Sequence, residues 1–275
     1  MAHHAHLAPG PWVVGLTLAV ALFAVTYGWG WMRLRLFTSN PLPAWRTASM
    51  FAGLAATWLA VASPIGAGDE RLLTFHMVQH LLLMTIAPPL IFLGEPGLAV
   101  WHGAARPPLR AAFTRSPLWP RLGGFAKALG QPAVCWLAAT ATLVGWHIPA
   151  AFALAMRSPA GHAVEQASFL VSGLLFWWPV VWPWPSRSEP QWSTVLYLFL
   201  ATLPCDILSG FLVFSDRVAY PVYLSTSSPL AVLGDQQCAG ALMWTVVTLV
   251  YLVAGTIVST QLLVWPSARP RLAEV

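Results

Sequence analysis

The chain has 275 residues, of which 57% are hydrophobic and only 8% are charged, and its formal net charge is +5. A soluble domain carries about 25% charged residues, so this composition excludes a water-facing globular surface and indicates a polytopic protein of the lipid bilayer. The 14 basic residues are spread along the whole chain. They form no nucleic-acid-binding patch, and we expect no nucleic-acid partner.

Long apolar segments follow one another, separated by breaks rich in Pro, Gly and charge. Each is near or above the roughly 18–20 residues that a helix needs to cross the bilayer core. The sequence therefore predicts an all-α bundle of seven transmembrane helices. The predicted spans are 11–32, 46–64, 71–93, 131–148, 163–183, 192–214 and 237–264. The membrane domain covers 11–265, between a short histidine-containing tail at 1–10 and a short cytoplasmic tail at 266–275.

The basic residues also predict an orientation. With the N-terminus outside, 11 of the 14 Lys and Arg residues fall in the segments on the inner side. The positive-inside rule therefore favours an outer N-terminus and an inner C-terminus. The longest inner connection, 94–130, contains Trp and Arg residues, and we expect its middle to form a helix on the membrane surface.

This orientation gathers polar side chains on the outer side of the predicted bundle. The stretch FHMVQHLLLM carries His76 and His80 at spacing i, i+4, which puts both on one helical face. His147 lies where the fourth span ends, and His162 lies just before the fifth. A polar group buried without a partner costs roughly 2–7 kcal/mol, so these groups are expected to serve one another or an ion.

The predicted metal ligands are His76, His80, His147 and His162. The residues predicted to support them by hydrogen bonds are Glu165, Asp206, Asp235 and Gln236. Several imidazoles with few carboxylates favour copper over calcium or magnesium and leave zinc open. A purely structural interpretation is also open: the histidines can bond to neighbouring helices, and an acid such as Glu165 or Asp235 suits a helix N-terminus.

Sulfur-containing residues are interpreted as packing residues. Met77, Met84 and Met243 occupy the same predicted helices as the polar residues, and thioether together with imidazole suits Cu(I). Methionine in a membrane helix usually packs, so all three stay outside the predicted site. The three cysteines show no CxxC spacing and are assigned to packing as well.

Motifs of several common activities are absent from the sequence. It contains no HExxH, P-loop or dinucleotide fingerprint. Lys127 is the one lysine, so the last predicted helix offers none for a retinal Schiff base.

Four stretches together, HMVQHLLLMTIAPPLIFLGEP, WHIPAAF, GLLFWWPV and GDQQCAGALMW, resemble the CtaG-type family of cytochrome c oxidase assembly factors. This is a seven-helix membrane family associated with caa3-type oxidases, and the resemblance covers roughly 45–265. It implies that His76, His80, His147 and the pair Asp235–Gln236 belong to shared motifs. Such proteins often carry a further histidine near Gln166, where this chain has glutamine and instead has His162.

The resemblance implies a non-enzymatic role in maturing a haem-copper oxidase of the bacterial plasma membrane. We expect the protein to bind or deliver copper at the outer face, with oxidase subunits and an extracytoplasmic copper donor as partners. One alternative is a haem-binding electron-transfer protein, with His80 opposed by His147. Another is a copper transporter, for which Met84 and Cys135 are the main candidates in the inner half.

Overall fold

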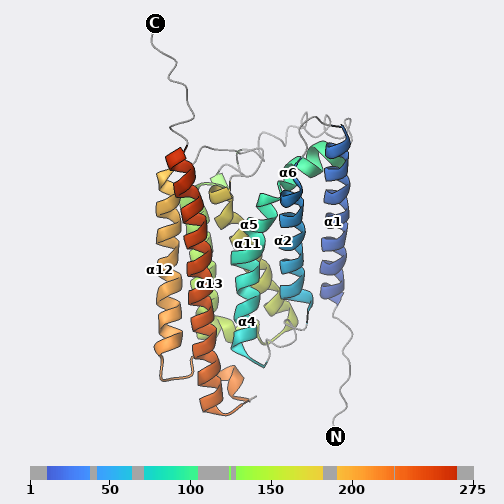
Figure 1. Cartoon of the computed structure of the whole chain (residues 1–275). Coiled ribbons are helices and arrows are strands. Elements are labelled where there is room, and N and C mark those ends of the chain that lie inside the picture. Colours follow the sequence, from blue (N-terminus) through green and yellow to red (C-terminus); the bar gives the residue numbers. More distant parts are fainter. Residues whose placement is uncertain are drawn as a thin grey trace.

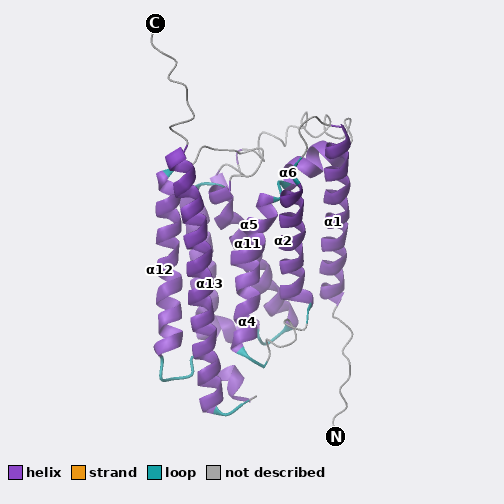
Figure 2. Ribbon diagram, viewed as in Figure 1, coloured by secondary structure: helices purple, strands orange, loops and turns teal. Residues whose placement is uncertain are grey.

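The computed structural model describes residues 11–37, 42–63, 71–104, 124, 128–181, 191–225 and 227–264. The secondary structure of these residues is helical, without strands, which confirms the all-α class for this part of the chain (Figure 2). The first half contains α1 (Pro11–Phe37), α2 (Ala44–Ala62), α4 (Leu73–His80), η1 (Leu81–Ile86), α5 (Ala87–Leu93), α6 (Pro96–Leu98) and η2 (Ala99–Ala104). The second half contains α9 (Pro132–His147), α10 (Pro149–Ala155), α11 (Pro159–Val181), α12 (Trp192–Phe214), η3 (Pro221–Ser225) and α13 (Pro229–Val264).

Helix occupies every predicted apolar segment, but not every helix meets the length and composition expected of a membrane span. Among the described residues five helical segments do: α1, the continuous run α4–η1–α5, α11, α12 and α13. The bent pair α9–α10 makes a sixth if it is counted as one span, and α2 falls outside this set. Seven spans therefore stay a prediction. The predicted surface helix within 94–130 lies largely outside the described residues, as do both predicted tails.

The long helices stand side by side and define two ends of the bundle (Figure 1). α1 and α4 begin at one end and α9 finishes there; we name this the histidine end, after His76, His80 and His147. α5 and α13 finish at the other end, which we name the arginine end after Arg46 and Glu95. The first and last described helices thus place residue 11 and residue 264 at opposite ends.

Buried side chains form two cores. The larger core joins α4, η1, α9, α11, α12 and α13, and it surrounds the predicted site. The smaller core joins α1 and α2 to η2 through Tyr27, Met50, Leu54 and Ala99. α12 and α13 pack against each other along most of their length (Figure 1).

A proline changes the helix type next to the predicted site. Pro88 has no backbone N–H, so the carbonyl of Met84, four residues earlier, loses its α-helical partner. The indole N–H of Trp177 on α11 donates to that carbonyl instead, at 3.1 Å. Close approach of α11 requires Gly173, because a Cβ there would lie 2.8 Å from the Met84 backbone. The chain therefore passes through the π-helical η1 and is held against α11.

A second proline sets the position of His147. Ile148 precedes Pro149 and adopts φ −67° and ψ 123°, an extended conformation that proline favours in its neighbour. α9 therefore ends at His147, and α10 leaves at 83° to it. The sequence did not predict α10 as a separate helix.

The last helix is longer than predicted. α13 has 36 residues and begins at Pro229, rather than at the predicted 237. At 1.5 Å per residue it is about 54 Å long, which exceeds a hydrocarbon core of roughly 30 Å. Asp235 and Gln236 therefore lie within α13, not before it.

Candidate metal centre

His76 and His80 form the centre of the site. Their i, i+4 spacing on α4 places the two rings on the same face, with centroids 4.3 Å apart. The rings are almost fully buried, with 1% and 5% of each residue exposed. Both side chains therefore face the interior of the bundle.

Glu165 on α11 reaches both rings with one oxygen. Its Oε1 lies 3.3 Å from His76 Nε2 and 3.5 Å from His80 Nε2, and the residue is fully buried. One ligand atom from each of the three side chains can be chosen so that all lie within 4.8 Å of one another. Glu165 was predicted only to support the ligands, and its distance from both rings adds it to the residues that could hold an ion.

His162 lies beside this cluster. It stands one turn before Glu165, and its ring stacks on His76 with centroids 5.3 Å apart. Gln166 donates a hydrogen bond from its amide to His162 Nε2 at 3.3 Å. Because Nε2 accepts this bond, the neutral ring carries its proton on Nδ1, and His162 coordinates an ion only after it releases Gln166 or loses that proton.

His147 faces the cluster from α9. Its ring centroid lies 6.3 Å from that of His80, and its Nδ1 donates to the Leu143 carbonyl at 2.7 Å. A carbonyl can only accept, so the neutral ring keeps its lone pair on Nε2. Tyr220 donates its hydroxyl to the His147 carbonyl at 3.1 Å, which fixes the end of α9. A small cavity of about 10 Å³, close to the volume for one water, touches His76, His80 and His147.

Several buried polar atoms of the cluster have no hydrogen-bond partner in the described part of the protein. They are His76 Nδ1, both ring nitrogens of His80 and Glu165 Oε2. Each buried unsatisfied group costs roughly 1–3 kcal/mol. Buried polar atoms are normally satisfied in proteins, so these four atoms mark the cluster as the candidate binding site.

Asp235 and Gln236 hold the neighbouring backbone. Asp235 accepts from the Leu73 N–H at 2.6 Å and from the Thr74 N–H at 3.4 Å, so this residue of α13 caps α4. Gln236 accepts from the Ala219 N–H at 2.7 Å, in the segment before η3. Both residues help position the elements that carry the histidines, but neither bonds to a histidine within the described structure.

Asp206 stands apart from the other predicted residues. It lies on α12 and is half-buried. Among the described residues no hydrogen bond or ion pair joins Asp206 to a histidine or to Arg217.

Three residues of the site were missed. Gln79 is fully buried and accepts from the Gln166 amide at 3.4 Å. It lies three residues after His76, so a polar residue in an apolar run at this spacing was a usable signal. Phe169 stacks on His80 with centroids 3.8 Å apart, and Tyr220 anchors His147; neither type of residue stands out in an aromatic-rich sequence.

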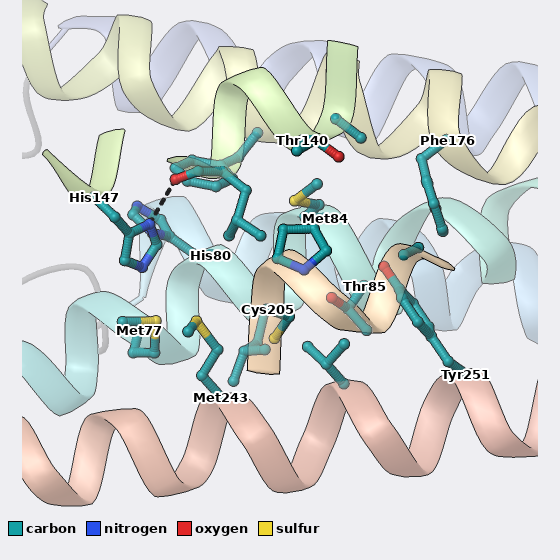
Figure 3. A pocket seen from close by; sticks show the side chains of 17 residues that line it. Met77, His80, Met84, Thr85, Thr140, His147, Phe176, Cys205, Met243 and Tyr251 are labelled. Carbon is teal, nitrogen blue, oxygen red and sulfur yellow. Dashed lines mark hydrogen bonds between the residues drawn. The ribbon is translucent and has the colours of Figure 1, made fainter. Parts of the chain in front are cut away.

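A larger internal cavity of about 40 Å³ begins at His80 and His147 and continues along the bundle toward Thr85 and Tyr251 (Figure 3). Sites for organic ligands typically have about 300–1,000 Å³. The cavity therefore fits water or a single ion.

A sequence model of the family described as cytochrome c oxidase caa3 assembly factor (Caa3_CtaG) matches residues 25–264. The chain belongs to this family. The match confirms the resemblance drawn from the sequence motifs, and it covers all the residues of the cluster.

Curated relatives from mycobacteria are similar over the same part of the chain. Uncharacterised proteins of Mycobacterium bovis and Mycobacterium tuberculosis are each 25% identical over 240 residues. One of Mycobacterium leprae is 21% identical over 242 residues. The aligned region covers 84% of this chain and 36% of each relative, so the chain spans about a third of their length. No solved structure matches.

Proposed function

We propose that this assembly factor binds a copper ion at the His76–His80–Glu165 cluster and serves copper insertion into a haem-copper cytochrome c oxidase. The observation that carries the proposal is the set of buried atoms without partners on these three side chains. The role is non-catalytic: the ion is taken up and passed on, and oxidase subunits receive it.

The donor set suits copper. Imidazole nitrogens bind copper and zinc, whereas calcium and magnesium require oxygen ligands. Two neutral imidazoles and the carboxylate of Glu165 carry one negative charge, all in a buried location. A monovalent Cu(I) neutralises that charge, which relieves the cost of keeping it away from water. His147 adds a further nitrogen, Nε2, and His162 lies close enough to accept the ion during transfer.

The proposed orientation places this site on the outer side of the bacterial plasma membrane. The distribution of Lys and Arg supports an outer histidine end in a bundle of seven spans. Copper arriving from an extracytoplasmic donor then meets the cluster near the membrane surface. α13 extends beyond the bilayer core at this end, which gives a docking partner an exposed element.

The size of the internal spaces favours an ion over haem. The cavities that touch the histidines have volumes of about 10 and 40 Å³, far below the space for a macrocycle. His76 and His80 also project from one face of α4, so they cannot hold a haem between them. A reduced-minus-oxidised spectrum with strong cytochrome bands would overturn the copper proposal.

Elemental analysis of the purified protein tests the proposal. We expect the wild type to hold about one copper per chain more than His76→Ala/His80→Ala. His102→Ala is the matched control, because η2 carries this histidine at the arginine end. Equal copper in the wild type and the double variant would show that the histidine cluster does not bind the ion. Zinc in place of copper would show that the proposed metal is wrong.

A test in cells addresses the oxidase. A strain that lacks the gene is complemented with the wild type, with His76→Ala/His80→Ala or with His102→Ala, and the copper content of its purified oxidase is measured. We expect full copper with the wild type and the control, and a loss with the double variant.

A further inference from the structure

The larger cavity, which starts at the histidines, is lined by an unusual number of sulfur-containing side chains. These are Met77, Met84, Cys205 and Met243. Figure 3 shows Met84 on one side of the cavity, with Cys205 and Met243 on the facing side and Met77 beside Met243. All four residues are buried, with between 2% and 8% of each exposed.

The sulfur residues converge from three separate spans, α4–η1–α5, α12 and α13. Met77 on α4 and Met84 in η1 continue the face that carries His80. Cys205 comes from α12 and Met243 from α13, which pack against each other at this level. Convergence of this kind follows from packing of helices far apart in sequence, so no local motif reveals it.

Buried sulfur elsewhere in the protein behaves differently. Met50 is fully buried in the smaller core, among apolar side chains, and lines no cavity among those of the described structure that touch the histidines. Cys135 donates its thiol to the Leu129 carbonyl at 3.1 Å and stands outside the cavity lining. Cys205 has only a weak contact, 3.8 Å from its sulfur to the Ser209 hydroxyl. The two groups of sulfur residues thus provide matched pairs for comparison.

We propose that Cys205, Met243 and Met84 form a second copper site, specific for Cu(I), on the inner side of the histidine cluster. Thiolate and thioether are soft ligands that select Cu(I) over harder ions. The cavity of about 40 Å³ has room for one ion between these side chains. Met77 lines both the small cavity and the larger cavity, so it lies between the histidine cluster and the proposed sulfur site.

His80 and His147 line both cavities, so the two proposed sites are neighbours. Passage of the ion between the sites rests on the proposed function, because the ion enters through the histidines. Copper arrives and stays as Cu(I), so no electron is transferred. The bond from Cu(I) to Cys205 replaces the S–H bond, and the thiol proton is released to the buffer.

X-ray absorption of the full-length protein in detergent, loaded with Cu(I) under anaerobic reducing conditions, tests the second site. We expect sulfur neighbours around copper in the wild type and their loss in Cys205→Ser/Met243→Leu. Cu(I) affinity, measured against a chelator, should fall at least tenfold in this variant. Cys135→Ser and Met50→Leu are the matched controls, and both should keep the sulfur signal.

The outcomes separate the two proposals. Nitrogen and oxygen neighbours alone in the wild type would overturn the sulfur site and leave the histidine site intact; this measurement needs no variant to fold. An unchanged sulfur signal in Cys205→Ser/Met243→Leu would overturn it as well. Loading His76→Ala/His80→Ala with Ag(I), another soft monovalent ion, isolates the sulfur site. Sulfur-bound Ag(I) in that variant supports the sulfur site even if the wild type fails to bind copper at the histidines.

Discussion

The two ends of the bundle each bury an acidic side chain, but they treat it differently. At the arginine end Glu95 pairs with Arg46 at 2.8 Å, and Arg46 also donates to the Leu93 carbonyl at 3.3 Å. At the histidine end Glu165 meets two imidazoles, and its second oxygen has no hydrogen-bond partner in the described structure. The comparison teaches that a buried acid can be paired within the protein, as Glu95 is, or can keep an oxygen without a protein partner, as Glu165 does at the proposed ion site.

The largest change in the free energy of unfolding is expected at the arginine end. Arg46→Ala removes the arginine that pairs with buried Glu95, and removal of one partner of a buried pair costs about 3 kcal/mol. Thermal unfolding in detergent should show the loss, while the copper bound per folded chain should not change. Arg35→Ala, at an exposed position, is the control and should be nearly neutral. An equal loss of thermal stability in Arg46→Ala and Arg35→Ala would show that the Arg46–Glu95 pair has no special structural role.

Copper should stabilise the protein chiefly through the histidine site. At a free copper concentration 100-fold above Kd, a bound ion adds about 2.7 kcal/mol to the free energy of unfolding. We expect this gain from the histidine site in the wild type and in Arg46→Ala, measured relative to each metal-free protein. His76→Ala/His80→Ala should gain less stability from copper, because only the sulfur site remains. An undiminished gain in the double variant would place the ion elsewhere.

Glu165→Gln removes the negative charge at the histidine end and keeps a side chain of almost the same size. Loss of the carboxylate should lower copper affinity roughly 10–100-fold, as removal of a ligand or of its charge partner does. The metal-free protein should be no less stable than the wild type, because the removed charge has no cation beside it. Chelator competition and unfolding of the same preparation give both values. If Glu165→Gln lost as much stability as Arg46→Ala, the acids at the two ends would have the same structural role in the metal-free protein.

The smallest effect is expected at Tyr220. Tyr220→Phe removes the hydroxyl that donates to the His147 carbonyl, which contributes about 0.5–1.5 kcal/mol. The end of α9 should then hold His147 less firmly, and copper affinity should fall a few-fold. Tyr197→Phe is a control with a similar buried hydroxyl that donates to the Phe176 carbonyl, away from the histidines. Equal copper affinity in the two variants would show that the end of α9 does not contribute to the site.

The sequence predicted what depends on one helix or on a count of charges. The i, i+4 spacing put His76 and His80 on one face, and the Lys and Arg distribution gathered His147 and His162 at the same end. Helix neighbours could not be predicted in this way. Asp235 caps a helix that begins 162 residues earlier in the chain, a contact that only the packing of α13 against α4 creates.

The direction of α10 and the positions of the sulfur residues also depend on contacts between helices, which the sequence did not predict. Pro149 was visible in the sequence, but the direction in which α10 leaves depends on its contact with α11. Cys135 was the expected inner sulfur residue, yet it bonds to the Leu129 carbonyl, and Cys205 lines the cavity instead. Composition cannot distinguish two cysteines in equally apolar helices.

The π-helical η1 also rotates the second half of one membrane span relative to the first half. A π-turn contains about one residue more than an α-turn, so it rotates everything that follows relative to everything before it. α4 packs mainly against α13, while α5, continuing the same span, packs mainly against α2. A single-residue deletion in η1 would change this rotation and point the α5 face away from α2. One span thereby serves both cores of the protein, with His76 and His80 at the histidine end and its contact with α2 at the arginine end.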